Sequence, residues 1–176
     1  MTRTQLEHVI RAAGAIAETD GLIVIGSQAI LASCPEAPPE LVASREVDLY
    51  PADNPAKADL IDGSIGEGSL FDEEFSYYAH GVGPETAKLP SGWRARAVAL
   101  RTPHTRGVTA FCLHPADLAV SKLLAGRDKD MAYVAGLLRH GLVTASAVRA
   151  VFGELEPGLL RLAEGRLALC LARQDA

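Results

Sequence analysis

Cysteine and long apolar runs are scarce in this sequence of 176 residues. The three cysteines, at positions 34, 112 and 170, are widely spaced and form no Cys-x-x-Cys pair, which argues against a disulfide framework or a zinc knuckle. We expect them to be reduced and mostly buried. The first ten residues lack the pattern of a signal peptide, and no apolar stretch has the length of about 18 residues that spans a membrane. The sequence therefore predicts a soluble, cytoplasmic protein with no membrane partner.

The chain also lacks an excess of positive charge. Its 17 Lys and Arg residues stand against 22 Asp and Glu residues, for a formal net charge of −5 and an isoelectric point near 5.5. This balance argues against a protein that coats nucleic acid without regard to sequence, although it permits a local basic groove. With 48% hydrophobic residues, the chain is long enough to bury one core. We expect a core over residues 1–140 and a helical extension over 141–176 that packs on it.

The most informative stretch is an apolar run that ends in Gly-Ser and is followed by a run containing two acids. Leu22–Ile25 predicts a buried strand, and Gly26 and Ser27 predict a turn into a short helix, where free backbone N–H groups can hold a phosphate. Further on, Glu46 and Asp48 alternate with apolar residues, so both carboxylates project from one strand face. One or two carboxylates together with substrate phosphates are a common ligand set for Mg²⁺.

Helical spacing and breaker residues outline the other elements. Thr4 and Glu7 have the spacing of a capping box at the start of a helix over 4–18. The proline-rich residues 34–40 predict a loop, and residues 71–75 an acidic cap or turn. The remaining pattern predicts a helix over 55–66, strands over 75–83, 93–101 and 108–113, and helices that begin near residues 115, 131, 144 and 157.

Four arginines and no acid occur between Arg94 and Arg106, with His104 among them. Such a stretch is compatible with a basic wall that guides a triphosphate or an RNA end. It is also compatible with a solvated edge strand, because edge strands commonly carry charge that discourages pairing with other chains. The sequence leaves both interpretations open.

A second informative stretch runs from His114 to Asp130. Leucines on the predicted helix supply a buried side, so that Lys122 is held as a point charge suited to phosphate oxygens. Gly126 permits a bend into the next helix, which brings Arg127 and Asp130 near the junction. Lys122 and Asp130 are also compatible with a simple ion pair between helices, which contributes little when exposed. His80 and His114 lack metal-ligand spacing, so we interpret both as structural or solvent-facing.

These two stretches carry a resemblance to known proteins. An apolar strand, Gly-Ser, a helix and a strand bearing Asp/Glu-x-Asp are typical of the nucleotidyltransferase superfamily. The phrase D-L-x-x-S-K-L-x-A-x-R-x-K-D, over residues 117–130, is similar to that of nucleotidyltransferase-like toxins of the AbiEii and MenT type. The two motifs cover residues 20–140. The resemblance implies an α+β fold with a nucleotidyltransferase-like mixed β-sheet flanked by helices, and the sequence adds a C-terminal helical segment.

The resemblance also implies an activity: transfer of a nucleotide from a nucleoside triphosphate to a tRNA end or to a protein hydroxyl. The resemblance further implies that the protein is the toxin of a toxin–antitoxin pair. On this analogy Gly26 and Ser27 hold phosphate, Glu46 and Asp48 bind Mg²⁺, Lys122 contacts the triphosphate, Arg127 contacts phosphate or substrate, and Asp130 is a catalytic or site-ordering carboxylate.

The sequence departs from the superfamily pattern in two respects. The first metal ligand is Glu46 in place of the commoner aspartate, and the strands expected over 94–100 and 108–113 provide no third carboxylate. Asp72 and the two glutamates that follow it precede a strand, but their spacing to that strand does not show which of them would face the site. The role of third carboxylate is therefore not assigned to any of them. One alternative is therefore a non-catalytic module that binds nucleotide or a protein partner. Another is an RNA-binding regulator that uses the arginines between positions 94 and 106.

Overall fold

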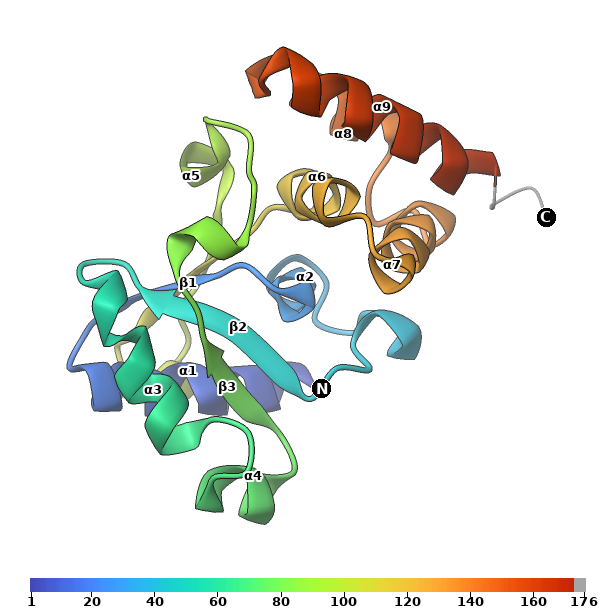
Figure 1. Ribbon diagram of the computed structural model, residues 1–176. Coiled ribbons are helices and arrows are strands. Elements are labelled where there is room, and N and C mark those ends of the chain that lie inside the picture. Colours follow the sequence, from blue (N-terminus) through green and yellow to red (C-terminus); the bar gives the residue numbers. More distant parts are fainter. Residues whose placement is uncertain (173–176) are drawn as a thin grey trace.

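The protein is built on one mixed β-sheet with helices on both sides (Figure 1). The computed structural model describes residues 1–172. None of the helices in this range has the length and apolar character that crossing a bilayer requires. The strands are β1 (Gly21–Val24), β2 (Glu46–Pro51), β3 (Tyr78–Gly81), β4 (Val98–Leu100) and β5 (Thr109–Cys112). The α-helices are α1 (Arg3–Ala17), α2 (Ile30–Ser33), α3 (Ala58–Ile65), α4 (Leu70–Phe75), α5 (Trp93–Arg96), α6 (Pro115–Ala125), α7 (Asp128–Arg139), α8 (Ala145–Ala150) and α9 (Pro157–Ala172).

The sheet combines parallel and antiparallel pairs in the order β3-β2-β1-β5-β4. The central strand β1 pairs antiparallel with β2 and parallel with β5. At the edges, β3 runs parallel to β2, and β4 runs antiparallel to β5. Figure 1 shows α1 and α3 on one side of the sheet, and α2, α6 and α7 on the other. The protein therefore has an α+β fold with a mixed sheet, as the sequence predicts.

The strand sequences account for their places in the sheet. Leu22–Val24 form a continuous apolar run and are all buried, because both faces of the central strand are covered. In the first four residues of β2, acidic and apolar residues alternate: Val47 and Leu49 are fully buried, whereas Glu46 and Asp48 remain partly exposed. The alternation thus places both acids of β2 on the face opposite Val47 and Leu49.

The last helix, α9, packs against α6 and α7. Arg166 on α9 donates hydrogen bonds of 2.6 and 3.0 Å to the carbonyl oxygens of Leu123 and Leu124, near the end of α6. That helix ends at Gly126, whose φ of 68° lies in the left-handed region that glycine adopts most readily. Arg166 therefore satisfies carbonyl groups that have no partner within α6, and α9 braces the helix that carries Lys122.

The start of α1 differs from the sequence prediction. Thr2 is the N-cap and forms a capping box with Gln5. This pair lies two residues before the predicted pair of Thr4 and Glu7. Both pairs have the same spacing, so the motif alone does not choose between them. In the structure Glu7 accepts a hydrogen bond from Arg3 instead, at 3.1 Å. The predicted capping box was therefore wrong, although the helix itself is confirmed.

Two other segments also differ from the prediction. Residues 71–75, interpreted as a cap or turn, belong to α4, which Ser69 caps by accepting a hydrogen bond from the Asp72 backbone. Residues 93–101, interpreted as one strand, divide into the single turn of α5 and the short strand β4. The helical turn directs Arg96 toward Asp117 and Glu154, with which it forms ion pairs. These tertiary contacts outweigh the strand-like alternation of the sequence.

Candidate functional site

The two acids of β2 lie beside the Gly-Ser turn that follows β1. A Cβ atom at position 26 would lie 2.2 Å from Asp48 Oδ2, so only glycine leaves room for this carboxylate. The backbone N–H of Ile25 donates to the Asp48 carbonyl at 3.0 Å, which continues the pairing of β1 and β2 up to the turn. The two halves of the first sequence motif, which are 20 residues apart, are therefore in direct contact.

A histidine from the neighbouring strand joins the acids. In the parallel register of β2 and β3, Asp48 lies opposite His80, and His80 Nδ1 lies 2.8 Å from Asp48 Oδ1. On the same strand, the Tyr78 hydroxyl donates to Glu46 Oε2 at 3.4 Å. One potential metal-ligating atom from each of Glu46, Asp48 and His80 lies within 4.8 Å of the other two. Two carboxylates and an imidazole therefore converge at one edge of the sheet.

A cluster of charged side chains from α6 and α7 forms the opposite wall of the site. Asp130 is only 1% exposed and lies between two cations. Lys122 Nζ is 3.2 Å from Asp130 Oδ1, and Arg127 Nε donates to Asp130 Oδ2 at 2.6 Å. Burial by itself would raise the pKa of the Asp130 carboxyl, but hydrogen bonds from Arg127 and the charge of Lys122 outweigh it and hold that pKa below its usual value. One carboxylate thus fixes two cations and leaves a surplus positive charge.

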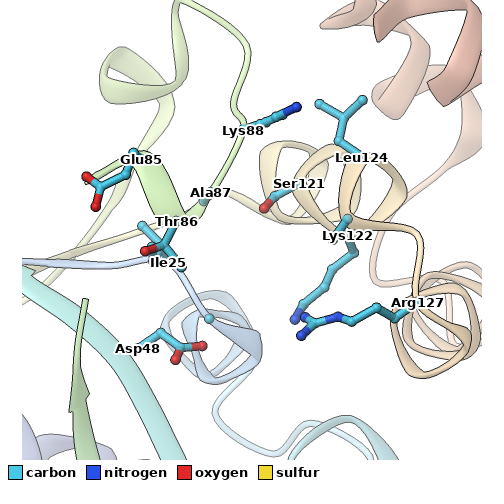
Figure 2. A pocket seen from close by; sticks show the side chains of 12 residues that line it. Ile25, Asp48, Glu85, Thr86, Ala87, Lys88, Ser121, Lys122, Leu124 and Arg127 are labelled. Atoms are coloured by element: carbon cyan, nitrogen blue, oxygen red, sulfur yellow. The ribbon is translucent and has the colours of Figure 1, made fainter. Parts of the chain in front are cut away.

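Two adjoining cavities separate the carboxylate edge from this cationic wall. Their volumes are about 450 and 180 Å³, and the larger falls within the range of about 300–1,000 Å³ found for small-molecule sites. Figure 2 shows Lys122 and Arg127 extending from the helical layer toward the side of the cavity where Asp48 lies. Both cavities are lined by Asp48, Thr86, Lys122 and Arg127. The carboxylates of β2, which can bind a metal cation, thus face the positively charged side chains of Lys122 and Arg127, which can bind an anion.

Tyr133 on α7 links the cationic wall to the Gly-Ser turn. Its buried hydroxyl donates a hydrogen bond of 2.7 Å to the Ser27 carbonyl, and Lys122 Nζ lies 5.6 Å from the centre of its ring. Burial raises the pKa of the Tyr133 hydroxyl, so this group remains a hydrogen-bond donor over the physiological pH range. The turn and the lysine are therefore positioned by the same side chain.

We expect Tyr133→Phe to lower the free energy of unfolding by about 1 kcal/mol, because it removes a buried donor and leaves the Ser27 carbonyl without its partner. Urea denaturation measures this change. Tyr78→Phe is the matched control: its hydroxyl makes only a long 3.4 Å contact with Glu46, so the loss should be smaller. An equal loss in both variants would show that the Tyr133 hydroxyl does not stabilise the turn.

The structure brings all the site residues predicted from the sequence to these two cavities, although their roles stay predictions. They are Gly26, Ser27, Glu46, Asp48, Lys122, Arg127 and Asp130.

His80 is exposed, as predicted, but its contact with Asp48 and the hydrogen bond from Tyr133 to the Ser27 carbonyl were not predicted. A polar, ionisable residue inside the strand predicted over 75–83 is the sequence signal that marks His80. His114 caps α6 by accepting from the Ala116 backbone, so the structural role predicted for it is confirmed.

A family model described as "Nucleotidyltransferase of unknown function (DUF6036)" matches residues 4–143. The match includes every residue of the candidate site and ends before α8. Neither the curated proteins nor the solved structures contain a significant match. The description names neither the AbiEii nor the MenT toxins, so a closer relationship to those toxins stays a prediction.

Proposed function

Because this chain belongs to the family of nucleotidyltransferases of unknown function, we propose that it transfers a nucleotide from a nucleoside triphosphate to an acceptor hydroxyl with the help of a divalent cation. One observation carries the proposal: the carboxylates of β2 face Lys122 and Arg127 across a shared cavity. A triphosphate with its bound cation needs carboxylates that hold the cation and positively charged side chains that hold the phosphates. The family alone supports nucleotidyl transfer in general, and the geometry supports these particular residues as the ones that perform it.

The carboxylate edge has the chemistry that a divalent cation requires. Glu46 and Asp48 are both partly exposed, and each offers a carboxylate oxygen toward the larger cavity. Mg²⁺ is ordinarily held by one or two carboxylates together with substrate phosphates and water, and these two acids supply such a set. When bound, the cation would neutralise charge on the triphosphate and orient its α-phosphate. Gly26 contributes by leaving space for Asp48, whose carboxylate an alanine would displace.

The cationic wall would hold the triphosphate. Lys122 is a compact charge that can neutralise phosphate oxygens. Arg127 lines both cavities, and its N–H groups that do not bond to Asp130 can donate to phosphate. We propose that the turn at Gly26 and Ser27 contacts a phosphate of the same triphosphate. The acceptor hydroxyl would attack the α-phosphorus as the bond to the departing pyrophosphate breaks. Catalysis of this kind rests mainly on positioning and on neutralising charge.

Asp130 would act as a positioning residue in this mechanism. Its carboxylate is buried and engaged by both Lys122 and Arg127, so it is not free to receive a proton from substrate. It instead holds the lysine ammonium in one place and prevents mutual repulsion of the two cations. Of the two roles that the resemblance left open for Asp130, the geometry therefore favours site ordering.

The acceptor that we propose is an RNA end, such as that of tRNA, or a protein hydroxyl, and the setting is a toxin controlled by an antitoxin. The phrase over residues 117–130, which resembles that of AbiEii- and MenT-type toxins, supports this setting. Induced expression in a bacterial host should then arrest growth, and Asp48→Ala should relieve the arrest. Equal arrest by both proteins would remove the toxin part of the proposal.

Label transfer tests the proposed activity. Purified protein is incubated with each radiolabelled nucleoside triphosphate, a divalent cation, and either total RNA or protein. We expect Lys122→Ala to reduce transfer about a hundredfold, the usual effect of removing one group that stabilises developing charge. Arg161→Ala, an exposed basic residue on α9, is the control and should keep full activity. Full activity in Lys122→Ala would exclude the lysine from the site.

A second candidate is a nucleotide-binding module without turnover. The observation that favours it is His80, which occupies the strand beside the two acids and supplies no third carboxylate. This candidate predicts cation-dependent binding of a nucleoside triphosphate in calorimetry, with no transfer of label to any acceptor. The label-transfer assay and the titration together separate the two candidates.

A further inference from the structure

Three donor groups converge where β2 and β3 lie side by side. His80 Nδ1 and Asp48 Oδ1 are 2.8 Å apart, and one ligand atom of Glu46 lies within 4.8 Å of a ligand atom of each. Two ligands on adjacent corners of an octahedral ion are about 3 Å apart when the metal–ligand bonds are about 2.1 Å long. The imidazole and the carboxylate therefore already have the spacing of neighbouring ligands on one ion.

The two strands fix this arrangement from the backbone. Asp48 and His80 are opposite each other in the parallel register, so their side chains emerge on the same face. Asp48 Oδ2 is confined by Gly26, where a Cβ would come within 2.2 Å, while Oδ1 faces the imidazole. The side chains of His80 and Asp48 are 50% and 23% exposed, so an ion entering from the larger cavity can reach both.

Donor chemistry decides which ion this set prefers. Mg²⁺ favours oxygen ligands and an almost ideal octahedral shell, and an imidazole nitrogen is a poor ligand for it. Carboxylates and water suit Mn²⁺ as well as Mg²⁺, whereas imidazole is a ligand of transition metals such as Zn, Cu, Fe and Ni. As a first-row transition metal, Mn²⁺ accepts an imidazole nitrogen more readily than Mg²⁺ does. A site with two carboxylates and one imidazole therefore favours Mn²⁺ over Mg²⁺ more than an all-carboxylate site does.

We propose that His80 is a direct ligand of the divalent cation, in the place of a third carboxylate, and that it makes the site select Mn²⁺ over Mg²⁺. This inference rests on the proposed function, because it concerns the cation of that same site. It differs from a role in which His80 only donates a hydrogen bond to Asp48. In that role the imidazole orients the carboxylate, and the cation meets oxygen ligands alone.

Pulsed electron paramagnetic resonance on the full chain with Mn²⁺ alone tests the inference. A directly bound imidazole produces nitrogen modulation of the Mn²⁺ signal, and ¹⁵N-labelled histidine shifts the modulation frequencies. Among the described residues that line the two cavities, His80 is the only histidine, so the assignment is direct. We expect the modulation in the wild type and its loss in both His80→Ala and His80→Asp.

Titrations with Mn²⁺ and with Mg²⁺ supply the second readout. We expect the ratio of Mn²⁺ to Mg²⁺ affinity to fall about tenfold or more in His80→Asp, which restores an all-oxygen set, and Mn²⁺ affinity to fall similarly in His80→Ala. The exposed position of His80 makes both variants compatible with folding, which circular dichroism checks.

The outcomes separate this inference from the proposed function. Bound Mn²⁺ without nitrogen modulation, or no Mn²⁺ binding at all, overturns the assignment of His80; the proposed function still stands if the wild type transfers label with Mg²⁺. Conversely, nitrogen-coupled Mn²⁺ in a protein that transfers no label with any cation supports the ligand assignment and removes the activity.

Discussion

We expect the replacement of Asp48 with asparagine to lower nucleotide transfer by about a thousandfold or more, while the fold remains intact. The change keeps the shape of the side chain but removes the charge that a divalent cation needs. A bound cation contributes several kcal/mol of transition-state stabilisation, and each 1.4 kcal/mol changes a rate about tenfold. The other acid of this strand face, Glu46, already belongs to the proposed ligand set, so it does not replace the lost charge.

The rate of label transfer at saturating triphosphate measures this effect. Asp59→Asn is the matched control, because Asp59 is an exposed aspartate on α3, away from the cavities, and its rate should equal that of the wild type. Asp48→Asn with more than a tenth of the wild-type rate would mean that the carboxylate does not serve the reaction.

Removing Arg96 has the largest effect on stability that we expect. Its guanidinium donates to both oxygens of Asp117, at 3.0 and 2.7 Å, and also to Glu154. Asp117 is fully buried in the first turn of α6. Arg96→Ala leaves this buried carboxylate without its counter-ion, so the free energy of unfolding should fall by about 3 kcal/mol or more.

Urea denaturation of two further variants identifies the cause of that loss. Arg94→Ala on the same helical turn is the control: Arg94 is exposed and stacks 4.7 Å from the Trp93 ring centre, so its removal should cost about 1 kcal/mol or less. The pair Arg96→Met and Asp117→Leu should recover much of the stability, because no buried charge remains unpaired. A double variant as unstable as Arg96→Ala would argue that packing, and not the buried charge, accounts for the loss.

The sequence predicts those parts of the site that depend on local patterns. Alternation in β2 predicted that Glu46 and Asp48 share a face, and the apolar run before Gly26 predicted the buried strand β1. These patterns work because backbone geometry alone sets which side chains point the same way. The order of the motifs also predicted that the residues form one site, and the structure brings them to two adjoining cavities.

Features that depend on pairing between distant segments could not be predicted in this way. The contact of His80 with Asp48 follows from the register of β2 and β3, which a single sequence does not specify. Arg96 was interpreted as part of a basic wall or an edge strand, but it pairs with Asp117, 21 residues away. The division of the chain near residue 140 stays a prediction.

The most direct test of nucleotidyl transfer compares two positions of the label in one triphosphate. The protein is incubated with its acceptor and a triphosphate labelled at the α-phosphate or, in parallel, at the γ-phosphate, beside the Asp48→Asn variant. Our account predicts that the acceptor gains label from the α-position only, that pyrophosphate is released, and that the variant transfers neither label. Label arriving from the γ-position would identify phosphate transfer instead, and would contradict the central claim that the acceptor attacks the α-phosphorus.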